Sequence, residues 1–292
     1  MRTVIVALVL ALATAPAAAA QTPSMAALAE ARTRVGAPDV ISPYGADPLQ
    51  IGHLRLPEGQ GPFPVVVLIH GGCWSAAYDD VTGMGPLAEA LTARGVATWN
   101  LAYRRLGDAG GGWPGTFEDV GAGIDHVRVL AGDHPLDLTR VVVAGHSAGA
   151  HLALWGASRP ALADARFGAD PLRPMAVVPI DGPGTLAGFI GIDAMACGRP
   201  VIVPFMGGTP QDLPEPYRIA SPQDQLPFGV RQLVVQAEFA PLMQPYVAAA
   251  QASGDAVETV VLEGADHFDP IVPGRPYGDR VVEAIVELVG DR

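Results

Sequence analysis

A serine that could act as a nucleophile lies at the centre of residues 145–149, which read G-H-S-A-G. Residues 141–143 before it are three valines, typical of a buried strand, and the sequence from Ala148 onward favours a helix. A sharp turn between such a strand and helix strains the serine backbone and exposes its oxygen. The N-terminus of the helix adds unpaired N–H groups and a positive dipole end, which stabilise a developing oxyanion. We therefore predict that Ser147 is a nucleophile and that the Ala148 amide is one oxyanion donor.

A second oxyanion donor is expected from a glycine-rich turn, H-G-G-C-W, which directly follows the apolar run 64–69. In enzymes with a G-x-S-x-G motif, a turn at this point contributes a backbone N–H to the oxyanion hole. Glycines there let the backbone approach the substrate carbonyl without an intervening side chain. We assign this role to Gly71 and Gly72, with an ordinary glycine turn as the alternative. We expect His70 to hold the turn by hydrogen bonding.

The general base must be a histidine, and only His151 and His267 follow Ser147 in the sequence. His151 belongs to the expected helix after the serine and is predicted to be structural. His267 lies within residues 262–269, L-E-G-A-D-H-F-D, a loop after the last expected strand. This places it at the carboxyl edge of the sheet, where Ser147 is also expected. We predict that His267 is the general base.

Apolar runs that alternate with helical patterns predict an α/β fold with an open, mostly parallel sheet and helices on both faces. The unbroken apolar run 64–69 is typical of a strand buried on both faces. We expect one domain over residues 21–292, with the long proline-rich segment 182–226 as a cap over the site. The expected strands cover residues 40–44, 50–56, 64–69, 96–101, 141–143, 176–180, 232–236 and 257–262, and the expected helices cover 83–94, 116–130 (capped by Thr116), 148–155 and 278–289.

The first twenty residues have the pattern of a signal peptide. Arg2 gives a positive start, residues 3–12 are apolar, and three alanines at 18–20 form a small-residue cleavage site. We therefore expect an exported protein, periplasmic or secreted, with a retained N-terminal anchor as the alternative and no membrane span in the mature chain. The net charge of −12 argues against nucleic acid and anionic membranes as partners. The oligomeric state stays open.

The chain has two cysteines, Cys73 and Cys197. An even number of cysteines in an oxidising compartment favours pairing, and two free buried thiols are the alternative. We expect a Cys73–Cys197 disulfide that ties the glycine turn to the cap segment.

The sequence resembles α/β-hydrolases of the group that contains bacterial carboxylesterases, feruloyl and acetyl-xylan esterases, and kynurenine formamidase. The motifs that carry this resemblance span nearly the whole chain: Y-G at 44–45, H-G-G-C-W at 70–74, N-L-A-Y-R at 100–104, W-P at 113–114, E-D at 118–119, G-H-S-A-G at 145–149 and D-H-F at 266–268. The resemblance implies an α/β-hydrolase fold and a serine-hydrolase mechanism on a small-molecule ester. Such a mechanism needs neither a metal nor an organic cofactor.

The chain departs from this group at the acid that should orient the base. The group usually carries it after the seventh strand, but Ala240 stands where the aspartate is expected. Asp181 follows the sixth strand, as the acid does in pancreatic-type lipases, and is our first candidate; a turn residue before Gly182 is the alternative. Glu238 lies in the usual loop and is the second candidate. Asp266 adjoins the base, and neighbouring loop side chains usually diverge.

Three functions are compatible with these residues. The leading hypothesis is an exported esterase that works through an acyl-enzyme. An amidase of the formamidase type would use the same residues, and a binding protein with a decayed triad is suggested by Ala240. An apolar pocket could be lined by a set of large side chains, with ordinary core packing as the alternative: Trp74, Phe189, Phe205, Met206 and Tyr217.

Overall fold

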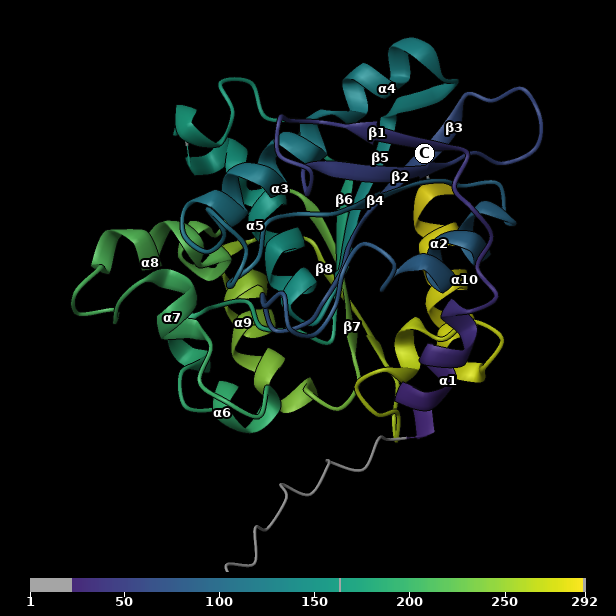
Figure 1. Cartoon of the computed structure of the whole chain (residues 1–292). Coiled ribbons are helices and arrows are strands. Elements are labelled where there is room, and N and C mark those ends of the chain that lie inside the picture. The colour runs from purple at the N-terminus through teal and green to yellow at the C-terminus, as the bar shows by residue number, and fades with distance from the viewer. Residues whose placement is uncertain (1–22, 163, 291–292) are drawn as a thin grey trace, which may run out of the picture.

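An eight-stranded, mostly parallel sheet forms the centre of the computed structural model, which describes residues 23–162 and 164–290 (Figure 1). The strand order is β1-β2-β4-β3-β5-β6-β7-β8, so the sheet is open. The two pairings β1–β2 and β2–β4 are antiparallel, and all the others are parallel. The strands are β1 Val40–Pro43, β2 Ile51–Arg55, β3 Phe63–Ile69, β4 Ala97–Leu101, β5 Leu136–His146, β6 Ala176–Ile180, β7 Arg231–Gln236 and β8 Val257–Val261. The predicted signal peptide lies outside the described residues.

Helices cover both faces of this sheet, as the alternating pattern predicted. Figure 1 shows α1, α2 and α10 together on one side, whereas α6, α7 and α8 form the flank on the other. The helices are α1 Pro23–Arg32, α2 Gly85–Thr92, α3 Gly115–Asp125, α4 Val127–Asp133, α5 Ala148–Leu162, α6 Asp193–Ala196, α7 Ile202–Met206, α8 Pro214–Ala220, α9 Ala240–Ser253 and α10 Pro276–Gly290. None of the described helices combines the length and the apolar character needed to cross a bilayer.

The apolar run in β3 lies between the two largest of the three hydrophobic clusters formed by the described residues. Val65, Val67 and Ile69 point into the larger core, which contains side chains of α3 and α5. Val66 and Leu68, which alternate with them, point into the second core beneath α1, α2 and α10. A strand with both faces buried in this way is typical of a parallel sheet, and it fixes the carboxyl end of β3 beside that of β5.

Two local predictions were wrong. The helix expected over residues 116–130 is two helices, α3 and α4, and Thr116 lies inside the first turn of α3 instead of capping it. Its hydroxyl donates to the Arg104 carbonyl and accepts from the Gly112 amide, so it holds the preceding loop.

Helix α9 was not predicted, because prolines lie in its first turn and in its interior; proline is well tolerated only in the first turn.

The segment 182–226 is more ordered than its proline-rich sequence suggested. It contains the short helices α6, α7 and α8, with the single 3-10 turns η2 Ala187–Phe189 and η3 Pro222–Gln225. Side chains from these elements, among them Phe205 and Tyr217, belong to the larger core. The segment is therefore packed against the domain, and its role as a cap stays a prediction.

Candidate active site

Ser147 lies on the sharp turn between β5 and α5, in a left-handed conformation with φ of 57°. Such a φ is unfavourable for a residue with a side chain and persists only where the surroundings impose it. A Cβ at Gly145 would collide with the Gly149 carbonyl, and one at Gly149 with the Ile69 carbonyl. The strand and the helix therefore pass close to each other at both glycines, and Ser147 is half-buried at the carboxyl edge of the sheet.

The glycine turn after β3 lies against this serine. A Cβ added at Gly71 would stand 3.1 Å from the Cβ of Ser147. Gly72 has a φ of 94°. Within the described chain, the amides of Gly71, Gly72 and Ala148 donate to no other group. These N–H groups could therefore bind an oxyanion, and their assignment to that role stays a prediction.

His70 holds the glycine turn, as expected. Its Nδ1–H donates to the Gly71 carbonyl at 2.8 Å, and its ring stacks on Tyr103 with centroids 4.4 Å apart. The Tyr103 hydroxyl donates to the His70 carbonyl at 2.9 Å. Burial lowers the pKa of His70, so the ring is neutral at neutral pH and serves as a structural support.

His267 and Asp181 are in direct contact. Nδ1 of His267 donates to Oδ2 of Asp181 at 2.7 Å, which meets the distance criterion for a strong hydrogen bond. Because a carboxylate oxygen can only accept, Nδ1 carries the proton and Nε2 of a neutral ring has its lone pair free. In this tautomer His267 can accept a proton at Nε2.

Asp181 is fully buried and its carboxylate is held on both oxygens. Oδ1 accepts the amides of Ala237 at 2.9 Å and Phe239 at 3.0 Å, while Oδ2 faces His267. Asp181 also has a positive φ, 47°, directly after β6. Both carboxylate oxygens therefore have hydrogen-bond partners, and Oδ2 is aimed at His267.

Asp181 is also close to the serine along the backbone. The Ser147 amide donates to the carbonyl of Ile180 at 2.9 Å, and a Cβ at Gly182 would collide with the Ser147 carbonyl. Adjacent parallel strands, β5 and β6, thus bring the serine turn and Asp181 together.

The other two carboxylates near the base have different partners. Glu238 accepts the backbone amide of His267 at 3.0 Å and makes no contact with the imidazole nitrogens. Asp266 turns away from the ring, as expected, and accepts the amides of Phe268 and Asp269 at 3.0 and 3.1 Å. Both shape the loop that carries His267.

His146, the second residue of the G-x-S-x-G motif, is a site residue that sequence reasoning missed. Its Nε2–H donates to the His267 carbonyl at 2.8 Å, and the two rings lie 4.5 Å apart. Burial, with a smaller effect of the neighbouring His267, lowers the pKa of His146 well below its usual value. A neutral His146 therefore fixes the backbone at His267. The variable position of the motif carried no signal that could have revealed this contact.

Ser147 and His267 are not hydrogen bonded to each other. Within the described chain, the Ser147 hydroxyl makes no hydrogen bond, and the only ring nitrogen of His267 that makes one is Nδ1. Catalytic hydrogen bonds are often long in a free enzyme and tighten when substrate binds. Both reactive atoms are thus unengaged at the same edge of the sheet.

His151 is structural, as predicted. It is fully buried, accepts from Trp74 Nε1 at 3.2 Å and donates from Nε2 to the Ala220 carbonyl at 2.7 Å. Burial lowers its pKa to about 4. The large side chains suggested for an apolar pocket are packed in the same core, with Trp74 against Phe189 and Phe205; the alternative of ordinary packing is confirmed.

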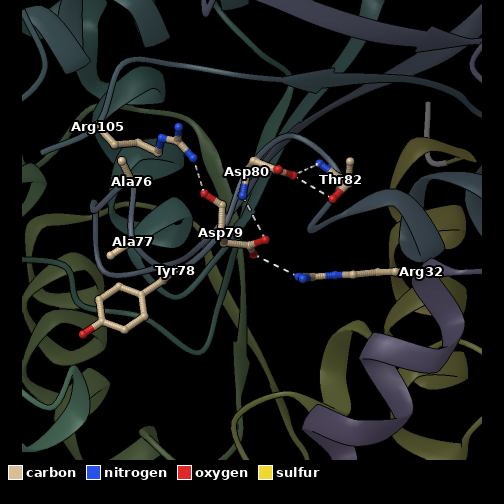
Figure 2. Close-up of a pocket in the computed structure, with 8 residues that line it drawn as sticks. All are labelled: Arg32, Ala76, Ala77, Tyr78, Asp79, Asp80, Thr82 and Arg105. Atoms are coloured by element: carbon tan, nitrogen blue, oxygen red, sulfur yellow. Dashed lines mark hydrogen bonds and ion pairs between the residues drawn. The ribbon is translucent and has the colours of Figure 1, made fainter. Parts of the chain in front are cut away.

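A polar cleft of about 170 Å³ opens beside the glycine turn (Figure 2). Arg32 of α1 reaches it from one side, and Arg105 from the other. Its lining consists of Arg32, Ala76, Ala77, Tyr78, Asp79, Asp80, Thr82 and Arg105. No group of three or more histidine, cysteine or acidic side chains with the arrangement of a metal site occurs among the described residues.

The predicted disulfide is confirmed. Cys73 and Cys197 are bonded, with their Cα atoms 6.0 Å apart. The bond joins the glycine turn directly to the segment 182–226. The Tyr78 hydroxyl adds a hydrogen bond of 2.6 Å to the Cys197 carbonyl, so the turn and the segment are connected at two points.

Comparison with known structures supports the fold. The chain superimposes on Esterase B from Lactobacillus rhamnosis with a TM-score of 0.74 and 18% identity, covering 91% of each chain. It matches a bifunctional GH43-CE protein from Bacteroides eggerthii with a TM-score of 0.68 and 20% identity, over 85% of this chain and 35% of that one. These similarities show an α/β-hydrolase fold.

Comparison of sequences identifies the family. Esterase EstD from Thermotoga maritima is 30% identical over 160 residues, which are 49% of this chain. The match covers 37% of EstD, so the chain corresponds to well under half of that relative. The BD-FAE family model matches residues 54–224, which include the glycine turn, the serine turn and Asp181. The chain therefore belongs to the BD-FAE family.

Proposed function

We propose that this protein is a serine hydrolase that cleaves carboxylic esters through an acyl-enzyme. The observation that carries the proposal is the 2.7 Å hydrogen bond from His267 Nδ1 to the buried Asp181 carboxylate. Ser147 lies at the same edge of the sheet, in a left-handed turn that packs against the glycine turn. The Gly71 and Gly72 amides of that turn make no hydrogen bond within the described chain. The similarity to esterases supports the same reaction class.

In the proposed reaction, Nε2 of His267 takes the proton of the Ser147 hydroxyl while Oγ attacks the ester carbonyl. The amides of Gly72 and Ala148, with Gly71 beside them, stabilise the negative charge on the carbonyl oxygen. The imidazolium then protonates the leaving alcohol, and the acyl group stays on Oγ. Water, deprotonated by Nε2 of His267, then attacks the acyl carbonyl; the bond to Oγ breaks, the imidazolium returns the proton to Oγ, and the carboxylic acid is released.

Asp181 has two roles in this scheme. It fixes the tautomer that leaves Nε2 free, and its charge stabilises the imidazolium formed during attack. Its contact with His267 supports a working triad over a decayed one, in spite of Ala240. An amide substrate would use the same residues with an amine as the leaving group, and parallel assays on esters and amides separate the two activities.

We further propose that the protein is exported and that the segment 182–226 caps the site. The Cys73–Cys197 bond supports an oxidising compartment, because such bonds are rare where thiols are kept reduced. It also supports the cap, since it ties that segment to the proposed oxyanion turn. Cleavage of the predicted signal peptide can be checked by N-terminal sequencing of the exported protein.

The proposed nucleophile and base can be tested directly. A fluorophosphonate probe should label Ser147, and Ser147→Ala and His267→Ala should each lower kcat for p-nitrophenyl acetate by about 10⁴ to 10⁶. Ser253→Ala and His134→Ala are matched controls, since neither residue lies in the proposed site. A site variant that keeps a tenth of wild-type activity, or labelling at another residue, would contradict the proposal.

A further inference from the structure

Helix α1 contacts both the loop of His267 and the segment behind the glycine turn, whose relative position matters for the proposed mechanism. Ser24, near its first residue, contacts the loop of His267, whereas Arg32, its last residue, contacts the segment that backs the glycine turn. The two residues are eight positions apart, or about 12 Å along a helix axis. The helix therefore spans the distance between the proposed base and the proposed oxyanion donors.

At the base end, the Ser24 hydroxyl is buried and donates to the Asp266 carboxylate. The same oxygen of Asp266 accepts the amides of Phe268 and Asp269, and the Asp266 amide donates to the Asp269 carboxylate at 3.0 Å. His267 lies inside this closed turn. A displacement of Asp266 would therefore move the backbone of His267 directly.

At the oxyanion end, Arg32 Nη2 donates to Oδ2 of Asp79 at 3.0 Å (Figure 2). Asp79 packs against the glycine turn: a Cβ at Gly72 would stand only 2.7 Å from the Asp79 Cβ. Arg105 holds the Asp79 carbonyl from the other side. The position of Asp79 therefore limits where the Gly72 amide can point.

Between these ends, α1 is fixed to the body of the protein. Leu28 is almost fully buried in the second core, with side chains of α2 and α10. A helix that is anchored in its middle and bonded at both ends moves as one piece. Helix α1 therefore holds the two loops at a fixed separation.

We infer that Ser24 and Arg32 are positioning residues, which set the distance between His267 and the Gly72 amide. This inference rests on the proposed function. It predicts an effect on kcat with little effect on KM, because Ser24 and Arg32 bond to Asp266 and Asp79 and not to Ser147 or the ring of His267. Misplacement of a catalytic group by about 1 Å can cost a factor of about 100 in rate.

The kinetic test compares Arg32 with Arg34, which lies two residues beyond the end of α1. Arg32→Gln should lower kcat for p-nitrophenyl acetate by about tenfold at unchanged KM, and Arg32→Lys should recover most of the loss by keeping a charge beside Asp79. Arg34→Gln is the matched control, because the one ion pair of the Arg34 side chain within the described residues is exposed and joins it to Glu30. Ser24→Ala should reproduce the kcat loss from the other end. An unchanged kcat in Arg32→Gln, or an equal loss in Arg34→Gln, would overturn the inference.

Hydrogen exchange of the same variants separates this inference from the proposed function. Arg32→Gln, but not Arg34→Gln, should speed amide exchange in both residues 70–79 and residues 264–269. If exchange becomes faster in neither loop, or only in residues 70–79, the inference that α1 positions both loops is overturned, whether or not the enzyme is active. Inactive wild-type protein whose Ser147 is not labelled, together with the expected exchange, would overturn the proposed function and leave the mechanical link supported.

Discussion

The loops after β6 and β7 end at the same edge of the sheet but contribute opposite groups to the site. The loop after β6 provides a carboxylate, Asp181, which faces His267. The loop after β7, where related enzymes usually carry the acid, provides two backbone amides, from Ala237 and Phe239, and both donate to Asp181. One loop thus supplies the charge and the other holds it.

This difference shows what the site requires of its acid. A buried carboxylate is costly unless its oxygens are hydrogen bonded, and here amides from the neighbouring loop meet that need. The strand that carries the acid can therefore change, provided that a carboxylate reaches Nδ1 and that its second oxygen finds donors. Ala240, which suggested a decayed site, is the first residue of α9.

The largest expected effect comes from removing the charge of the first loop. Asp181→Asn keeps the shape of the side chain but offers an amide that can select the other tautomer of His267, so kcat should fall by about 10⁴. Steady-state kinetics with p-nitrophenyl acetate would measure this loss.

Returning an acid to the second loop sharpens the same comparison. In an Asp181→Asn background, Ala240→Asp should raise kcat about tenfold above that of the single variant if a carboxylate there can reach His267. Circular dichroism should show that both variants are folded. An Asp181→Asn enzyme within tenfold of wild type would remove Asp181 from the mechanism.

A smaller effect is expected from the amides of the second loop. Phe239→Pro removes one N–H donor to Asp181 and also the ring beside His267, whereas Phe239→Ala removes the ring alone. A hydrogen bond to a charged group contributes about 1.5–3 kcal/mol, so the proline variant should be slower than the alanine variant by about tenfold. Equal kcat values would mean that this amide does not support the acid.

The smallest effect is expected from the one carboxylate of the second loop. Glu238 accepts only the backbone amide of His267, and Glu238→Gln keeps an oxygen that can accept it. We therefore expect a change in kcat of about threefold or less. A loss approaching that of Asp181→Asn would reverse the assignment of the two loops.

Much of the fold was predictable because the sequence carries strong local signals. The apolar run of β3 and the valines of β5 indicated buried parallel strands, and glycines at 145 and 149 marked the close approach of backbones around Ser147. His267 followed by elimination from the small number of histidines. Asp181 could be ranked first because it ends the strand beside the serine.

The rest depended on contacts between distant segments, which leave no local pattern. His146 is a variable position of its motif, and its bond to the His267 carbonyl joins residues 121 positions apart. The amides that hold Asp181 belong to a loop whose side chains suggested a missing acid. Helix α1 showed no chemical motif, because the role inferred for Ser24 and Arg32 depends on their bonds to Asp266 and Asp79, which are distant in the sequence.

The disulfide has one further consequence, for the covalent connectivity of the site. The bond between Cys73 and Cys197 closes a ring across a sequence separation of 124 residues, and this ring contains Ser147 and Asp181 but not His267. Ala169 and Asp170, which are exposed, lie between the nucleophile and the acid. A protease that cut there would leave two fragments still joined through sulfur, seen as one band on a non-reducing gel and two after reduction. Nicked protein could therefore keep its complete site until a reductant separates the halves.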